Sequence, residues 1–158
     1  MALIVVESPT KARTFNRILK IQNKSDQYFV YATMGHFRDL PASKMAIDFT
    51  KQFKPEYVID AKKKKVADQL KELAEKNDEI ILATDLDREG ESISYHVAYL
   101  LGFIKEKWPQ LELKKEVGKR KVSRIVFHEI TPKALQEALD NPQELRLDLV
   151  RAQQGRRL

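Results

Sequence analysis

Short apolar runs alternate with amphipathic segments along this chain, and the alternation limits the folds it can adopt. The runs lie at 2–7, 27–35, 56–60, 78–85 and 122–129. Segments with helical spacing of apolar residues lie at 8–19, 62–77, 88–102 and 131–141. A helix that follows a strand returns the chain to the same edge of the sheet, so successive strands become parallel. We therefore expect an α/β, Rossmann-like fold, with a mostly parallel sheet and helices on both faces.

Start and stop signals flank several of the expected helices. Ser8 and Thr131 suit the cap position that precedes a helix, and each is followed by a proline, which suits the first helical position. Gly102 suits the end of the helix at 88–102. Residues 36–55 show no clear period, and we expect them to be irregular.

The charge of the chain permits binding to a polyanion. The 158 residues carry 29 Lys and Arg against 23 Asp and Glu, which gives a net charge of +6. Residues 103–121 form a basic excursion with seven Lys or Arg and three Glu, and we expect a hairpin around Trp108. Because charge runs usually form solvated faces, we interpret this excursion as a variable loop rather than a further contact with a polyanion.

Composition excludes several classes of protein. Cysteine is absent, so the chain has no disulfide, thiol nucleophile or thiolate metal site. Apolar runs are too short for a membrane helix, and residues 1–9 become acidic too early for a signal peptide. We expect a cytoplasmic protein without a membrane partner.

Acidic residues gather where the run at 78–85 ends. Asp85, Asp87 and Glu89 are spaced by two residues, which places them on one side of an extended chain. Carboxylates this close repel one another unless a cation joins them, and Mg²⁺ prefers oxygen ligands. Functional sites of open α/β sheets lie at the carboxyl ends of strands. The pattern therefore favours a Mg²⁺ site.

Two alternatives use the same acids. A purely structural role would make Asp87 the N-cap of the next helix, with Glu89 and Glu91 complementing the helix dipole. This alternative explains Asp85 less well and stays open. A calcium loop requires a bidentate Glu at its twelfth position, which is His96 here, so we set it aside.

A phosphate-accepting signalling module is a third alternative. Such a module needs a lone acceptor aspartate after another strand, and Asp60 is the candidate. A run of lysines follows Asp60, which makes this alternative weaker.

The first strand and helix repeat the arrangement of strand, acid and capped helix. Glu7 follows the run at 2–7, and Lys11 lies in the first turn of the next helix. A cation in that turn opposes the helix dipole and is often simply a solvated surface residue. Beside Glu7 at a helix N-terminus, Lys11 is also a candidate to bind a phosphate.

Five segments in order resemble one family. They are VVESPTKA, MGHFRDLP, LATDLDREGE, RIVFHEIT and LVRAQQGRRL. Together they resemble the N-terminal region of bacterial-type DNA topoisomerases I, which are type IA topoisomerases, and the resemblance covers nearly the whole chain except 103–121. It implies a Toprim domain at 1–140. It also implies that 141–158 begin the first helix of the following DNA-groove domain, which is truncated at residue 158.

The resemblance implies a reaction in which a tyrosine attacks a DNA phosphate and holds the 5′ phosphate covalently while a strand passes. Glu7 matches the acid that moves protons at the leaving 3′ oxygen, and Lys11 matches a basic residue near the scissile phosphate. Asp85 and Asp87 match the metal ligands, with Glu89 supporting them, and Glu7 is assigned to the same metal site. Mg²⁺ is then the cofactor, needed chiefly for rejoining.

The resemblance also assigns DNA contacts to Lys11, His36, Arg88, Arg156 and Arg157. The implied partners are DNA, preferentially single-stranded, in the cytoplasmic nucleoid, and the missing downstream domains of the same enzyme. The runner-up interpretations are a Toprim domain of a primase or nuclease, and a Mg²⁺-dependent signalling or DNA-binding module.

Tyrosine is where the resemblance fails. The five tyrosines lie in expected strands or in the helix at 88–102, and none stands in a context resembling the family's nucleophile motif. They are Tyr28, Tyr31, Tyr57, Tyr95 and Tyr99. We therefore expect the fragment to be inactive alone.

The basic balance predicts weak binding of single-stranded DNA that depends on salt. Each phosphate contact with a single strand contributes a slope of about −0.7 to log affinity against log salt concentration. We expect the affinity for short oligonucleotides to fall between low and moderate salt, with little sequence preference. Fluorescence anisotropy with a labelled oligonucleotide measures this affinity, and an affinity that does not change with salt contradicts the electrostatic account.

Overall fold

Five strands form the main sheet of the chain. In the computed structural model, which describes residues 1–34, 38–39, 47–48, 54–55, 58–59, 64–107, 110–114 and 116–145, their order is β10-β11-β7-β1-β2. They are β1 (Ala2–Val6), β2 (Tyr28–Ala32), β7 (Glu79–Leu82), β10 (Glu116–Val117) and β11 (Arg120–Arg124). β1 runs parallel to β2 and β7, and β7 runs parallel to β11, whereas β10 is antiparallel to β11.

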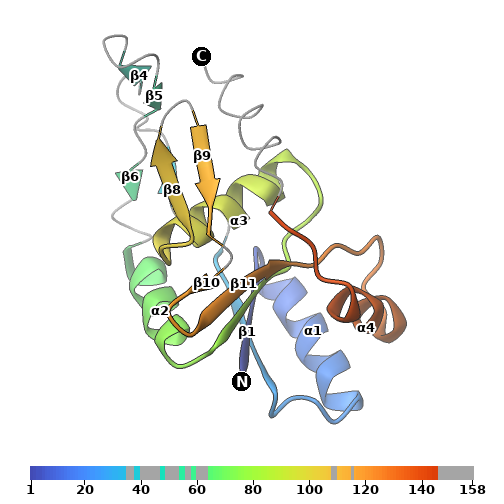
Figure 1. The fold of residues 1–158 in the computed structure, drawn as a ribbon. Coiled ribbons are helices and arrows are strands. Elements are labelled where there is room, and N and C mark those ends of the chain that lie inside the picture. Colours follow the sequence, from blue (N-terminus) through green and yellow to red (C-terminus); the bar gives the residue numbers. More distant parts are fainter. Residues whose placement is uncertain are drawn as a thin grey trace.

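Helices cover both faces of this sheet (Figure 1). They are α1 (Pro9–Ile21), α2 (Lys64–Glu75), α3 (Arg88–Leu100) and α4 (Pro132–Asp140). Alternate residues of β1 point to opposite faces: Ile4 packs in a core with α1 and α4, and Leu3 packs in a second core with α2 and α3. Burial on both faces explains why β1 is apolar throughout. The predicted α/β class and the mostly parallel sheet are confirmed.

The predicted helix ends are also found. The side chains of Ser8 and Thr131 accept hydrogen bonds from the backbone N–H groups of Lys11 and Ala134, at 3.2 and 3.1 Å. Gly102 follows α3 with a φ of 89°, a left-handed conformation that glycine adopts without strain. The local sequence therefore sets where these helices begin and end.

The strand expected at 56–60 does not join the parallel sheet. β6 (Val58–Ile59) pairs antiparallel with β3 (Arg38–Asp39), and β4 (Ile47–Asp48) pairs antiparallel with β5 (Lys54–Pro55). The expected strand is therefore present at Val58–Ile59, but in a separate antiparallel pair and not in the parallel sheet. The apolar run was too short to indicate which strands it would pair with, because a lone pair of β-branched residues has no pattern that selects a neighbour.

The basic excursion contains the predicted hairpin. β8 (Ile104–Lys107) pairs antiparallel with β9 (Gln110–Leu113), and Lys105 lies opposite Glu112. The hairpin projects away from the main sheet (Figure 1). Phe103 and Ile104 at its base are buried in the core beside α3, which anchors the hairpin to the fold.

Residues 141–145 return to the sheet after α4. Gln143 forms a bridge with Arg124, and Leu145 is buried in the core shared with α2 and α3. The proposed helix of the next domain lies mostly at 146–158, outside the described residues, so the division at 140 stays a prediction. None of the helices in the described part of the chain is long and apolar enough to cross a membrane.

Candidate catalytic and metal-binding site

The ends of β1 and β7 bring the first predicted site residues together. The two strands are parallel neighbours, with Val5 opposite Leu82, so their carboxyl ends lie at the same edge of the sheet. Glu7 directly follows β1, and Asp85 follows β7 after Ala83 and Thr84. Two acids that are distant in the sequence thus face one another across neighbouring strands.

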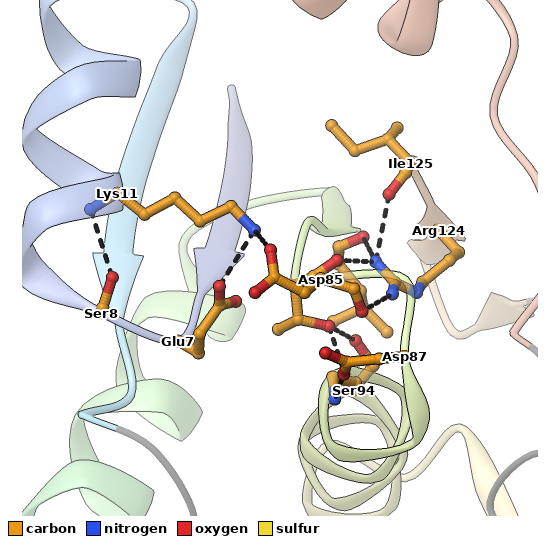
Figure 2. A network of polar contacts seen from close by, with 11 residues as sticks. Glu7, Ser8, Lys11, Asp85, Asp87, Ser94, Arg124 and Ile125 are labelled. Atoms are coloured by element: carbon orange, nitrogen blue, oxygen red, sulfur yellow. Dashed lines mark hydrogen bonds and ion pairs between the residues drawn. The ribbon is translucent and has the colours of Figure 1, made fainter. Parts of the chain in front are cut away.

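Lys11 joins these two acids. Its ammonium nitrogen lies 3.0 Å from Glu7 Oε1 and 3.0 Å from Asp85 Oδ1. Figure 2 shows the Lys11 side chain extending from α1 across the edge of the sheet to Asp85. The side chain is only 6% exposed, and the nitrogen lies 5.0 Å from the centre of the Phe127 ring. That ring makes an edge-on contact with Phe15 of α1, so an aromatic wall supports the ammonium.

The two carboxylates differ in exposure. Asp85 is 65% exposed, whereas Glu7 is 19% exposed. The second oxygen of Glu7, Oε2, is buried and has no hydrogen-bond partner among the described residues. A buried carboxylate oxygen without a partner is costly, which suits an atom that receives a proton or faces a cation during function.

Asp87 and Glu89 occupy different positions from Asp85. Asp87 is the N-cap of α3, and its carboxylate accepts a hydrogen bond of 2.6 Å from the backbone N–H of Gly90. Glu89 lies exposed in the first turn of α3, where an acid complements the helix dipole. Asp87 and Glu89 therefore occupy the positions that the purely structural alternative expects, a helix cap and the first helical turn. In the described part of the chain, no three acid or histidine side chains are close enough to hold a metal ion.

Arg124 is a central residue that sequence reasoning missed. Its Nε donates a 2.6 Å hydrogen bond to Glu91 Oε1, and both side chains are fully buried. Its Nη1 and Nη2 donate to four backbone carbonyls at 2.7–3.1 Å, those of Leu82, Thr84, Ile125 and Asp85. The signal was a charged residue inside the run at 122–129, but Glu91 was assigned only to the helix dipole.

Close packing also shapes the turn between β7 and α3. A side chain at Gly90 would place its first carbon 1.8 Å from the carbonyl oxygen of Asp85, so only glycine fits without a shift. Thr84 donates a 2.6 Å hydrogen bond to the Gly90 carbonyl and shares a 2.7 Å hydrogen bond with Ser94. The backbone that carries Asp85 and Asp87 is thus held from several sides (Figure 2).

Of the predicted DNA contacts, Lys11 and Arg88 are among the described residues. Arg88 opens α3 next to the acids, and its Nη1 is buried without a hydrogen-bond partner among the described residues. His36, Arg156 and Arg157 lie outside the described residues, so their assignment stays a prediction.

Three of the described tyrosines have no setting typical of a nucleophile. Tyr95 is fully buried within α3. Burial raises the pKa of Tyr31, and burial, together with the nearby charges of Glu79 and Asp140, raises the pKa of Tyr28. A raised pKa keeps a phenol protonated and makes it a weaker nucleophile. Tyr57 lies outside the described residues.

The Toprim domain family matches residues 2–130, so the chain belongs to this family. The α/β fold and the acids at the edge of the sheet agree with this assignment. Toprim domains bind a divalent metal ion, which agrees with an acidic site at this edge. The family that the sequence resembled is also found among curated relatives. DNA topoisomerase 1 of Thermotoga maritima is 43% identical over 155 residues, which cover 98% of this chain and 21% of the relative.

Two further similarities agree with this relative. DNA topoisomerase 1 of Rickettsia typhi is 44% identical over 157 residues, which cover 99% of this chain and 18% of the relative. The solved structure of full-length topoisomerase I from Thermotoga maritima matches with a TM-score of 0.79 at 42% identity, covering 98% of this chain and 23% of that one. The chain therefore spans about a fifth of the length of its relatives.

The buried ion pair predicts that two acids on the same helix differ in their effect on stability. Glu91→Ala should lower the free energy of unfolding by about 3–5 kcal/mol, because Arg124 would keep an uncompensated charge in the interior. The matched control, Glu89→Ala, should cost much less, because Glu89 is exposed. Urea unfolding followed by circular dichroism compares the two, and equal losses contradict a central role for the pair.

Proposed function

We propose that this chain is the Toprim portion of a type IA DNA topoisomerase, which relaxes DNA by transient single-strand cleavage and strand passage. The observation that carries the proposal is the Lys11 ammonium held 3.0 Å from both Glu7 and Asp85 at the edge of a Toprim sheet. The named relatives, which match 98–99% of the chain, support the same class of enzyme.

Glu7 and Lys11 would act directly on the DNA phosphate. Lys11 carries a positive charge at the N-terminal turn of α1, so its ammonium and the helix dipole both favour a phosphate oxygen. Glu7 would give a proton to the leaving 3′ oxygen on cleavage and take it back on rejoining, through its unpartnered Oε2. Both side chains are held by neighbours, which fixes their positions before the substrate arrives.

The acidic edge fits a Mg²⁺ ion. Mg²⁺ is usually held by one or two carboxylates, with waters and substrate phosphates completing its shell, so three gathered acids are not required. Asp85 is exposed, Asp87 and Glu89 follow it in the same turn, and Glu7 keeps one oxygen without a partner. When bound there, the ion would neutralise charge that develops on the phosphate.

The remaining parts of the reaction would come from outside this chain. A nucleophilic tyrosine and the groove for single-stranded DNA belong to downstream domains, which would be entered through 141–158. Lys11, His36, Arg88, Arg156 and Arg157 are proposed to contact the DNA backbone. The enzyme would act on nucleoid DNA in the cytoplasm.

This division of labour predicts that residues 1–158 form no covalent DNA adduct and relax no supercoiled DNA, with or without Mg²⁺. The cause is the missing nucleophile, because attack requires a tyrosine positioned at the phosphate. Denaturing electrophoresis with an end-labelled single strand tests for the adduct.

Adding the downstream domains should restore relaxation, and Glu7→Ala in that protein should then abolish most cleavage. Glu72→Ala, an exposed acid of α2, serves as the control and should leave cleavage unchanged. An adduct on the isolated chain that maps to one of its own tyrosines would overturn the proposal.

The metal assignment predicts that Asp85→Asn combined with Asp87→Asn removes Mg²⁺ binding and preserves the fold. Asparagine can still cap α3 through its side-chain oxygen, and the substitutions remove two negative charges that attract the cation. Asp26→Asn with Asp78→Asn, two exposed acids near the amino ends of β2 and β7, is the control. Isothermal calorimetry compares the variants, and equal Mg²⁺ affinity in the double variant and the wild type would disprove the assignment.

A further inference from the structure

The Lys11 ammonium lies between the acids that a divalent cation would use. We propose that Lys11 is a built-in counter-ion, and that it and a divalent cation compete for the Asp85 carboxylate. The proposal rests on the metal site of the proposed function, but not on the topoisomerase reaction.

The geometry of the ion pairs makes the competition direct. Lys11 Nζ lies 3.0 Å from one oxygen of Asp85 and 3.0 Å from one oxygen of Glu7, so a single positive charge is shared by two negative ones. A cation that binds Asp85 would meet this ammonium at short range, and two like charges repel. Lys11 therefore lowers the affinity of the edge for a metal, even though it belongs to the site.

The exposed fractions of the side chains indicate which of the two ion pairs of Lys11 would break when a cation binds. Lys11 is 6% exposed, and the ring of Phe127 lies 5.0 Å from its nitrogen, so the lysine has little freedom to move. Glu7 is 19% exposed and lies four residues before Lys11, directly after β1. Asp85 is 65% exposed and can turn into solvent. The structure thus assigns the exchange to Asp85, while Lys11 stays on Glu7.

The exchange couples two ligands of the site. When Asp85 turns to the cation, a donor of the Lys11 ammonium that now faces Asp85 becomes available to a phosphate oxygen. Metal and phosphate should therefore bind with positive coupling, and the coupling should be reciprocal. Lys11 would then be the residue that links the two ligands.

Replacement of Lys11 with methionine tests the competition without any measurement of enzyme activity. Lys11→Met keeps the length of the apolar stem beside Phe127 and removes the charge. Lys76→Met is the matched control, because it removes the same charge from an exposed lysine that pairs with Glu72 at 3.3 Å. Calorimetric titration with Mn²⁺ and Mg²⁺ gives the affinities of both variants and the wild type.

We expect Lys11→Met to bind the metal about fivefold more tightly than the wild type, the factor expected from losing one partly exposed ion pair. Lys76→Met should stay close to the wild type. Equal or weaker binding by Lys11→Met overturns the proposal, as does an equal gain in Lys76→Met, which would reflect net charge alone. Binding that is measurable only in Lys11→Met supports it.

A measurement on the wild type keeps the test independent of how the variant folds. During a Mg²⁺ titration followed by nuclear magnetic resonance, the Lys11 ε-methylene and the Asp85 carboxyl signals should shift at the same metal concentration. The Lys76 signal should not move. A shift of Asp85 without Lys11, or no metal binding in any protein, overturns the competition. The adduct experiment on the extended protein judges the topoisomerase proposal separately.

Discussion

The buried pair of Arg124 and Glu91 is the interaction on which the rest of the site depends. Arg124 ends β11, Glu91 lies in α3, and the guanidinium also holds the carbonyls of Leu82, Thr84 and Asp85. A single side chain thus ties two strands and a helix to the turn that carries the acids. Charge in the interior is stable only with such complete pairing, because removal of one partner leaves an unsolvated charge. The hydrogen bonds from Arg124 to the carbonyls of Thr84 and Asp85 stabilise this turn.

A second ionic contact, on the opposite side of Asp85, has a different character. Lys11 reaches from α1 to Glu7 and Asp85, and the Asp85 end of this contact is open to solvent. Arg124 holds the backbone of Asp85, whereas Lys11 holds its side chain. The backbone of Asp85 is therefore held by a hydrogen bond, while its carboxylate stays open to solvent. Under the proposed function, this combination would let the site admit and release phosphate and metal.

Much of the fold could be predicted because its signals are local. The caps at Ser8 and Thr131 and the left-handed Gly102 depend on neighbours within a few residues, and the two-sided burial of β1 is visible in its apolar run. The partner of β6 could not be predicted, since pairing of a two-residue strand depends on distant chain. Arg124 escaped notice for a similar reason: its partners lie 33–42 residues away, apart from its own neighbour Ile125.

By itself, the sequence determined that acids follow two strands and that a lysine follows one of them. Because the strands were expected to be parallel, the sequence also predicted that Glu7 and Asp85 lie at the same edge of the sheet. The pairing of β1 with β7 agrees with this prediction. Only the tertiary structure decided which contacts each of the acids makes. Asp87 caps a helix, Glu91 is buried against Arg124, and Asp85 pairs with Lys11. The physical reason is that a carboxylate's role depends on its burial and on the charge it meets, and both are set by chain that is distant in sequence.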